Sequence, residues 1–318
     1  MMQNGTAIEI LDLSRRFGSI TAVDHLNLAI PRGELFGLVG PDGAGKTTAL
    51  RMLAGILAPT EGDAIVAGHS VRKEPEALKG KIAYMSQRFG LYGDLTVLEN
   101  LSFYADLFEI PKKERAARIE RLLSFSNLTP FKHRLADTLS GGMKQKLGLA
   151  CALIHTPEIV LLDEPTNGVD PVSRRDFWRI LYEMLKEGVT ILVTTAYLDE
   201  AERCNRVGMM HHGRLLALDT PDRIKERMGG ELVEIQVADA WRARQVLSAV
   251  PVARSVTLFG RRLHVRVDAM GRDLRAVLAA LDAEGLQPHD PRQVVPSLED
   301  VFISMIERRD GGVHERAA

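Results

Sequence analysis

The distribution of hydrophobic positions predicts an α/β core of short buried strands and helices. Residues 7–13 and 22–30 alternate between apolar and polar positions, which is typical of antiparallel strands, with a turn expected at 16–18. Further on, wholly apolar runs alternate with helical patterns, as in a doubly wound parallel sheet. The apolar runs lie at 34–39, 82–85, 158–162 and 189–194, and the helical patterns at 48–54, 171–187 and 198–204.

Two other stretches break this alternation. Between 88 and 150 the pattern is helical, with Thr96 expected to cap one helix and an amphipathic helix at 112–124. After Asp219 the order becomes strand, helix, two strands, helix and strand, which predicts a small α+β module of the ferredoxin-like type. The predicted organisation is a first domain at 1–225 that contains this helical subdomain, an α+β module at 226–308 and a disordered tail at 309–318.

The composition is that of an ordinary globular protein. Of 318 residues, 45% are hydrophobic and 26% are charged, and the formal net charge of −1 gives no overall attraction to nucleic acid or to an anionic membrane. The two cysteines, Cys151 and Cys204, form no disulfide framework, which fits a reducing cytoplasm. The N-terminal residues lack a secretory pattern and no apolar run reaches about 18 residues, so we expect another polypeptide to supply any membrane span.

The sequence GPDGAGKTT at 40–48 has the spacing of a phosphate-binding loop. An apolar strand pattern precedes it and a helical pattern follows it, so a glycine-rich turn with a chance Lys-Thr pair is the weaker interpretation. Glycines let backbone N–H groups surround an anion, and the start of a helix adds a positive dipole. Lys46 is expected to reach the outer phosphates of a nucleotide, and Thr47 to hold Mg²⁺. The residues expected to bind are Gly40, Pro41, Asp42, Gly43, Ala44, Gly45, Lys46, Thr47 and Thr48.

Two further segments carry chemistry that suits a bound nucleotide. Asp163 and Glu164 end an apolar strand, where Asp163 would hold Mg²⁺ and Glu164 would polarise an attacking water. An exposed acidic turn is the alternative interpretation. Ser140, Gly141 and Gly142 open a helix whose first N–H groups suit a second phosphate contact. Two such helix starts in one chain suggest nucleotides sandwiched between two copies or partners.

The sequence LSGGMKQ at 139–145 resembles the signature motif of ATP-binding-cassette (ABC) transporters, and other motifs between 8 and 219 follow in that family's order. The chain is similar to the nucleotide-binding subunit, which implies a P-loop ATPase fold. The resemblance implies that Phe17 stacks on adenine, that Gln87 links Mg²⁺ and water to the helical subdomain, and that 167–170 touches an opposite subunit. It also implies catalytic roles for Lys46, Gln87 and Glu164, and Mg²⁺ ligation by Thr47, Gln87 and Asp163.

The segments that follow Gln87 and that span 297–306 resemble the ABC-2 exporter branch, which includes drug-resistance and multidrug ATPases. The motifs are most similar to the first cassette of a bacterial exporter ATPase that carries two cassettes in tandem. The resemblance implies ATP and Mg²⁺ as cofactors, and a multi-span permease and a second cassette as partners, in a homodimer or a heterodimer. It implies a cytoplasmic chain at the inner face of the cell membrane, attached only through the permease, with no nucleic acid partner.

Two positions depart from the family pattern. Ala196 stands where the family has a histidine that contacts the γ-phosphate and the attacking water, and Asp42 stands where asparagine is common. Loss of one such transition-state donor costs roughly 10²–10³ in rate. We therefore expect slow ATP cleavage at this chain's own site, in an asymmetric pair with a second ATPase; an active homodimer is the alternative. A non-hydrolysing regulatory cassette and a soluble ABC ATPase outside transport stay open as alternative functions.

Overall fold

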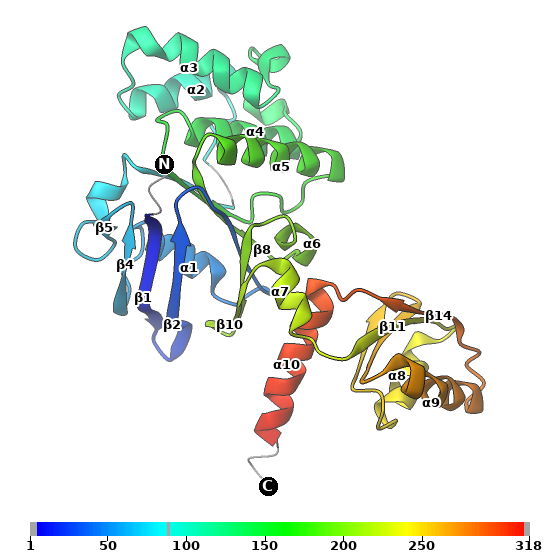
Figure 1. Ribbon diagram of the computed structural model, residues 1–318. Coiled ribbons are helices and arrows are strands. Elements are labelled where there is room, and N and C mark those ends of the chain that lie inside the picture. The colour runs from blue at the N-terminus through cyan, green and yellow to red at the C-terminus, as the bar shows by residue number, and fades with distance from the viewer. Residues whose placement is uncertain (1–4, 88–89, 315–318) are drawn as a thin grey trace. The chain divides into compact units, whose positions relative to one another are not determined.

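The computed structural model describes the backbone of residues 5–87 and 90–314 and the side chains up to Ile306 (Figure 1). The chain divides into two compact units, Met1–Leu218 and Asp219–Ala318. The predicted boundary between 225 and 226 lies within helix α7 (Pro221–Glu226), and this helix belongs to the second unit. Thr220 caps this helix through a hydrogen bond from the N–H of Arg223, so the change of domain comes before the helix and not after it.

An antiparallel sheet opens the first unit, as the alternating pattern predicted. Its strands are β1 (Thr6–Phe17), β2 (Ile20–Pro31), β4 (Glu61–Val66) and β5 (His69–Ser70), in the order β2-β1-β4-β5. β1 is longer than predicted and continues through Phe17, so the turn begins at Gly18. The register of β1 against β2 shifts near Leu13 and Arg15, and these irregularities interrupt the alternation that marks a strand in the sequence.

A mostly parallel sheet forms the centre of the first unit, with the strand order β10-β9-β3-β8-β7-β6. The strands are β3 (Leu35–Val39), β6 (Ile82–Met85), β7 (Ile159–Asp163), β8 (Thr190–Thr195), β9 (Arg206–His211) and β10 (Arg214–Asp219). Every residue of β3, β7 and β8 is buried, which confirms the prediction from the apolar runs. Because these three strands run parallel, their carboxyl ends meet at one edge of the sheet, and the loops that follow them come together there.

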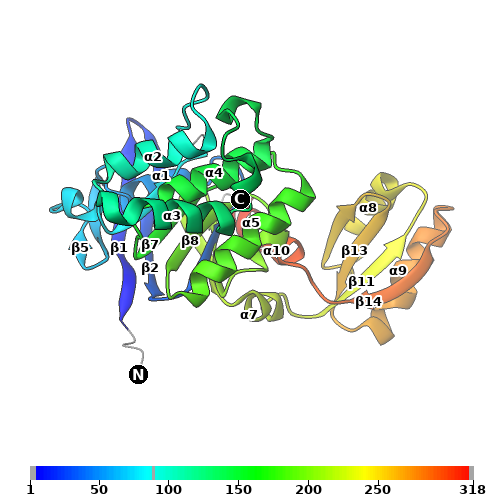
Figure 2. The same cartoon turned by 90° about the horizontal axis from the view of Figure 1, so that it is seen from above.

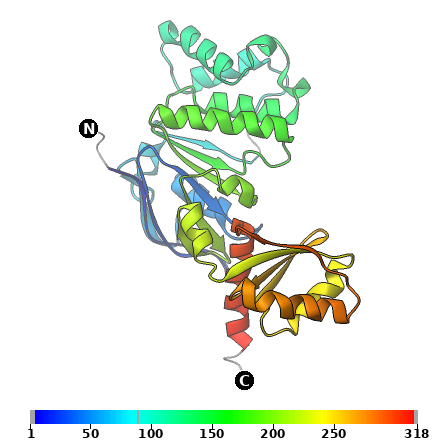
Figure 3. The same ribbon diagram turned by 45° about the vertical axis from the view of Figure 1, so that its right-hand side comes forward.

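Helices cover both faces of the parallel sheet, so the predicted doubly wound core is confirmed. Helix α1 (Lys46–Leu53) shares one hydrophobic core with the antiparallel sheet and with Leu161 and Leu192 of the parallel sheet. Helix α5 (Pro171–Lys186) lies on the opposite side of the parallel sheet (Figure 3). The short helix α6 (Leu198–Ala201) follows β8 and contacts both β3 and β8.

The predicted helical subdomain is present and has a hydrophobic core of its own (Figure 2). Its helices are α2 (Val97–Leu107), α3 (Lys112–Phe125) and α4 (Gly141–Ala152), with short 3₁₀ turns at Thr129–Phe131 and Ala136–Thr138. A further 3₁₀ turn, Pro75–Leu78, lies before β6. Thr96 caps α2, as predicted, and forms a reciprocal pair with Glu99 in which each side chain accepts from the other's backbone N–H. Across the described residues, no helix is both long and apolar enough to cross a bilayer.

The second unit has the predicted ferredoxin-like order of elements. Its elements after α7 are β11 (Glu231–Gln236), α8 (Ala240–Ser248), β12 (Ser255–Phe259), β13 (Arg262–Val267), α9 (Met270–Ala283), β14 (His289–Val294) and α10 (Leu298–His314). Neighbouring strands of this sheet are antiparallel, in the order β12-β13-β11-β14, and α8 and α9 share its hydrophobic core. Helix α10 continues as far as His314, into the segment 309–318 that was predicted as a disordered tail. Residues 315–318 lie outside the described part.

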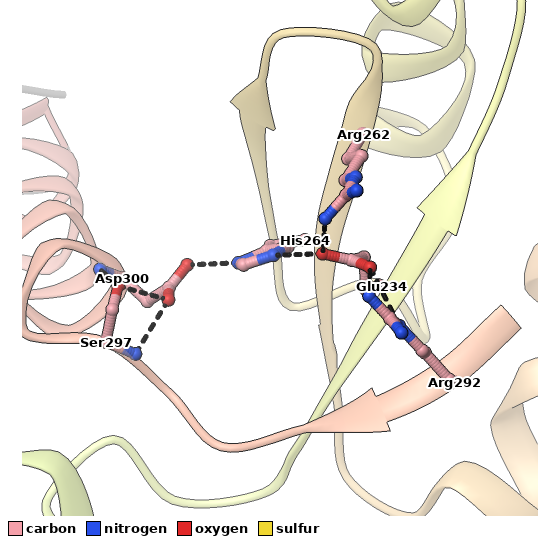
Figure 4. Close-up of polar contacts among 6 residues, drawn as sticks. All are labelled: Glu234, Arg262, His264, Arg292, Ser297 and Asp300. Carbon is pink, nitrogen blue, oxygen red and sulfur yellow. Dashed lines mark hydrogen bonds and ion pairs between the residues drawn. The ribbon is translucent and has the colours of Figure 1, made fainter.

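A charged network lies where α10 begins, on the second unit's sheet (Figure 4). His264 of β13 stands between two carboxylates: its Nδ1 is 2.8 Å from Asp300 Oδ1 and its Nε2 is 3.4 Å from Glu234 Oε2. Glu234 also accepts from Arg292, at 2.6 and 2.9 Å, and from Arg262 at 3.3 Å. These contacts connect the first turn of α10 to three strands of the sheet.

Candidate nucleotide-binding site

The loop between β3 and α1 requires glycine at two positions, because other backbone segments pass close to it. A Cβ on Gly40 would overlap the carbonyl oxygen of Met210, and a Cβ on Gly45 would overlap that of Ala22. Gly45 directly precedes α1 and has a φ of +103°, a conformation that side chains disfavour. The backbone thus forms a narrow turn at the N-terminus of a helix, which is the shape that surrounds a phosphate group.

Two side chains at the start of α1 contact the carboxylates of Asp163, the last residue of β7, and of Glu164, which follows it. Lys46 is 3% exposed; its Nζ donates to two carbonyl oxygens of the loop, at 2.8 and 3.1 Å, and lies 3.1 Å from Glu164 Oε1. Thr47 Oγ1 donates to Asp163 Oδ1 at 2.9 Å. The ammonium group suits the outer phosphates of ATP, and the hydroxyl and carboxylate oxygens suit Mg²⁺. The residues present therefore fit ATP and Mg²⁺.

Asp163 and Glu164 are neighbours in different environments. Asp163 is 1% exposed and accepts from the hydroxyl groups of Thr194 at 3.0 Å and Tyr84 at 3.4 Å. Burial, reinforced by the charge of Asp163, raises the pKa of Tyr84, so this hydroxyl stays protonated as a donor. Glu164 has a positive φ of +46°, which is unfavourable for a residue with a side chain. Its N–H donates to both the carbonyl oxygen and the hydroxyl oxygen of Thr194, and these hydrogen bonds stabilise the conformation.

Three donors converge on the carboxylate of Glu164. Besides Lys46, the side-chain amides of Gln87 and Asn167 each lie 3.3 Å from Oε2. Gln87 also lines a second pocket, of about 300 Å³, together with residues of the helical subdomain that include Asp137. Gln87 therefore contacts the candidate catalytic carboxylate and lines a pocket with residues of the helical subdomain.

Most of the predicted nucleotide-binding residues of the phosphate loop, together with Phe17 and Gln87, line one pocket of about 550 Å³. Phe17 stands at its edge with 45% of its surface exposed. Sequence reasoning missed Arg15, whose guanidinium carbon lies 4.5 Å from the ring centroid of Phe17 and supports the ring by a cation–π contact. The lining residues are Phe17, Ala22, Asp42, Gly43, Ala44, Gly45, Lys46, Thr47, Thr48, Gln87, Glu164 and Asn167.

Position 196 lies beside this pocket. Ala196 follows the last residue of β8, is exposed, and lines a neighbouring pocket of about 260 Å³ with Asp42, Glu164 and Asn167 among others. A side chain at this position thus faces the same space as the candidate catalytic carboxylate. Ala196 presents only a methyl group there and donates no hydrogen bond.

Sequence reasoning also missed Glu200, which is 0% exposed in α6. Its Oε1 accepts from Thr166 at 2.6 Å and its Oε2 from Thr195 at 2.9 Å, and Arg174 of α5 lies 3.3 Å away in an ion pair. A glutamate in the first turn of a short helix is expected to lie on the surface. The partners of Glu200 instead come from three separate segments of the chain. No local pattern in the sequence points to this network.

The predicted second phosphate contact lies apart from the first. Ser140 caps α4 through a hydrogen bond from the N–H of Met143, and both Ser140 and Gly141 are exposed. Gly142 is buried, and a Cβ at this position would overlap Ser173 in the first turn of α5. Among the described residues that line the 550 Å³ pocket, none belongs to this segment. The structure therefore brings together the loop, the strand-end acids and Gln87, and leaves 140–142 on another surface.

Comparison with known proteins agrees with this geometry. Residues 23–167 match the family described as ABC transporter, and residues 220–306 match the C-terminal domain of DrrA1-3-like ATP-binding proteins. The daunorubicin resistance ATP-binding protein DrrA2 of Streptomyces coeruleorubidus is 33% identical over 99% of both chains. The chain belongs to the ABC transporter family. This ABC protein therefore carries the family's cassette followed by a module similar to the C-terminal domain of DrrA1-3-like ATP-binding proteins.

Two further relatives define the extent of the match. The probable multidrug ABC transporter ATP-binding protein YbhF of Escherichia coli (strain K12) is 42% identical over 95% of this ABC chain but only 52% of its own length. The chain thus spans about half the length of that curated relative. A solved structure titled as the ATP binding subunit of an ABC transporter matches 70% of the chain and 93% of its own, with a TM-score of 0.63 and 30% identity.

Proposed function

We propose that this chain binds and hydrolyses MgATP as the ATP-binding subunit of an ABC-2 type exporter. The observation that carries the proposal is the convergence of Lys46, Thr47 and Glu164 at one pocket lined by the phosphate loop, with Asp163 hydrogen-bonded to Thr47. Mg²⁺, when bound, would neutralise charge on the transferred phosphoryl group. Lys46 would exchange its contact with Glu164 for the outer phosphates, and the freed carboxylate would accept a proton from the attacking water.

The hydrolysis step at this chain's own site is proposed to be slow. Position 196 faces the space beside Glu164, and its methyl group supplies no donor where charge develops in the transition state. The groups that bind ATP lie elsewhere, in the phosphate loop and at Phe17, so Ala196 leaves binding intact. Binding without efficient cleavage also suits the second candidate function, a regulatory cassette that closes on ATP and leaves hydrolysis to its partner.

A second cassette completes the proposed assembly. Ser140 and Gly141 are exposed at the start of α4 and do not line the pocket of their own chain among the described residues, so they are available to a nucleotide bound on another cassette. Because the chain's own site is proposed to be slow, we favour an asymmetric pair with a different, competent ATPase. A separate multi-span permease would supply the membrane path, and its co-purification with the chain from membranes tests this part.

Steady-state ATP hydrolysis by the purified chain and its variants tests the proposal. We expect the wild type to bind ATP and hydrolyse it slowly, and Ala196→His to raise the rate by roughly tenfold or more, because histidine restores a transition-state donor. Glu164→Gln in the Ala196→His background should remove this gain while ATP binding persists. A wild type without ATP binding contradicts the proposed function. An ordinary wild-type rate of about 1–10 s⁻¹ that histidine does not raise contradicts only the slow site.

A further inference from the structure

The buried carboxylate of Glu200 connects the loop after β7, which contains Glu164, with the end of β8. Each oxygen of Glu200 accepts from a different threonine, Thr166 after β7 and Thr195 at the end of β8, at 2.6 and 2.9 Å. Arg174 of α5 supplies the opposite charge at 3.3 Å. An ionised carboxylate with no exposure is costly unless it is paired and hydrogen-bonded, so loss of any partner leaves an unsatisfied charge. The network therefore favours one arrangement of the two loops.

Both threonines lead directly to the candidate site. Thr166 precedes Asn167, whose amide donates to Glu164. Thr195 precedes Ala196, and its carbonyl oxygen accepts from the N–H of Gly40 in the phosphate loop at 3.4 Å. A displacement of either threonine therefore moves a residue that faces the reacting groups.

The hydrogen bonds of Thr195 have a fixed direction. Its Oγ1 accepts from the N–H of Tyr197 at 3.0 Å, and its single hydroxyl proton points to Glu200. Arg174 completes the enclosure: its guanidinium carbon lies 4.7 Å from the ring centroid of Tyr197 while its Nε faces Glu200. A carboxylate at position 200 satisfies all three partners, because it accepts from Thr166 and Thr195 and pairs its negative charge with Arg174.

We propose that Glu200 is a positioning residue that holds the loop after β7 and the loop after β8 as one unit for ATP hydrolysis. This inference rests on the proposed ATPase function. Among the described residues that line the two pockets beside Glu164, Glu200 does not appear, so it acts through Thr166 and Thr195 and not by touching ATP. Its loss should lower kcat and leave ATP binding nearly unchanged, because orientation contributes to the transition state more than to the bound substrate.

Glu200→Gln is the most informative variant, because the amide has the same size but offers one acceptor oxygen and no charge. In the Ala196→His background, which gives a measurable rate, we expect kcat to fall by about tenfold or more while the Kd for ATP stays within about twofold. Thr166→Val removes the hydrogen bond to Glu200, and Thr195→Val removes the hydrogen bonds to Glu200 and from Tyr197. Each should lower kcat less than Glu200→Gln does, because the carboxylate remains. Adding Thr166→Val to Glu200→Gln should lower kcat by less than the product of the two separate losses, since both changes act on the same hydrogen-bond network. Equal losses in kcat and in ATP affinity, or fully additive losses, would overturn the inference.

Hydrogen–deuterium exchange of the nucleotide-free full chain provides a readout that needs no hydrolysis. Glu200→Gln should increase exchange in 164–167 and in 194–197 together, because one carboxylate fastens both segments. Asp199→Asn is the matched control: Asp199 is the neighbouring acid in α6 and is exposed, so both segments should keep the wild-type rates. Unchanged exchange in Glu200→Gln contradicts the inference whether or not ATP binds. If Glu200→Gln does not fold, the two threonine variants decide, because each retains the carboxylate.

Discussion

Single residues in the signature segment meet requirements that spacing alone does not reveal. A Cβ on Gly142 would overlap both the Cβ and the Oγ of Ser173, and it would lie 3.3 Å from a methyl carbon of Val169. We therefore expect Gly142→Ala to force α4 away from α5 and to lower the free energy of unfolding by about 1–3 kcal/mol. Urea unfolding of the full chain, followed by a signal from the first unit, measures the loss.

Two further variants show whether this loss comes from the overlap. Gly141→Ala is the matched control, since no neighbouring atom lies within 4 Å of a Cβ at that position. Ser173→Gly removes the obstructing atoms and should restore part of the stability of Gly142→Ala, although a glycine inside a helix costs about 1 kcal/mol. If Gly141→Ala and Gly142→Ala lose the same stability, or Ser173→Gly brings no recovery, the close packing of α4 on α5 does not determine this position.

Residues of the candidate site differ in how well the sequence predicts them. The phosphate loop and the acids after β7 are predictable because each lies in one short segment whose spacing follows from the geometry of phosphate and metal binding. Glu200 has no such signal: Thr166, which it binds, lies 34 residues away in the chain. Arg15 is predictable only once β1 is known to continue through Phe17, because residues two apart in a strand share a face.

At the scale of elements, a histidine fastens the start of α10 to the sheet of the second unit. Burial alone would lower the pKa of His264, but the hydrogen bonds and charges of Asp300 and Glu234 outweigh burial and raise it. Interactions with His264 and other donors hold the pKa values of both carboxyl groups below their usual range despite burial. Arg262 and Arg292 also donate to Glu234, and the hydrogen bonds and charge of Glu234 raise the pKa of Arg292.

The sign of the pH dependence follows from the raised pKa of His264. The protonated imidazole stabilises the folded module fully below the pKa of the unfolded chain, about 6.5, and this stabilisation is lost as the pH rises through the higher folded pKa. We expect the coupling free energy between His264→Gln and Asp300→Asn, from a double-mutant cycle, to be larger at about pH 6 than at about pH 9. Unfolding of the full chain, followed by a probe in α10, measures it. A coupling that does not change with pH would contradict a change in the protonation of His264 over this range.

Elements were easier to predict than their ends. The buried strands and the ferredoxin-like order follow from apolar runs and turn residues, which act over a few positions. The end of β1 was misplaced because register shifts against β2 interrupt the alternation of apolar and polar positions. The contact between His264 and α10 depends on the fold of the whole module and has no counterpart in local patterns.

At the scale of the whole molecule, the two candidate phosphate contacts of the first unit do not share a pocket among the described residues, which favours sites that form across two cassettes. Lys46→Ala removes the loop cation, and Gly141→Asp places a negative charge at the exposed start of α4. Each variant, in the Ala196→His background, should be inactive alone. In an equal mixture, half of the randomly formed pairs are mixed and each mixed pair has one intact site, so roughly a quarter of the parent rate should return. ATP hydrolysis of the mixture against each variant measured alone checks this. If no activity returns, the loop and the signature segment do not act across two copies.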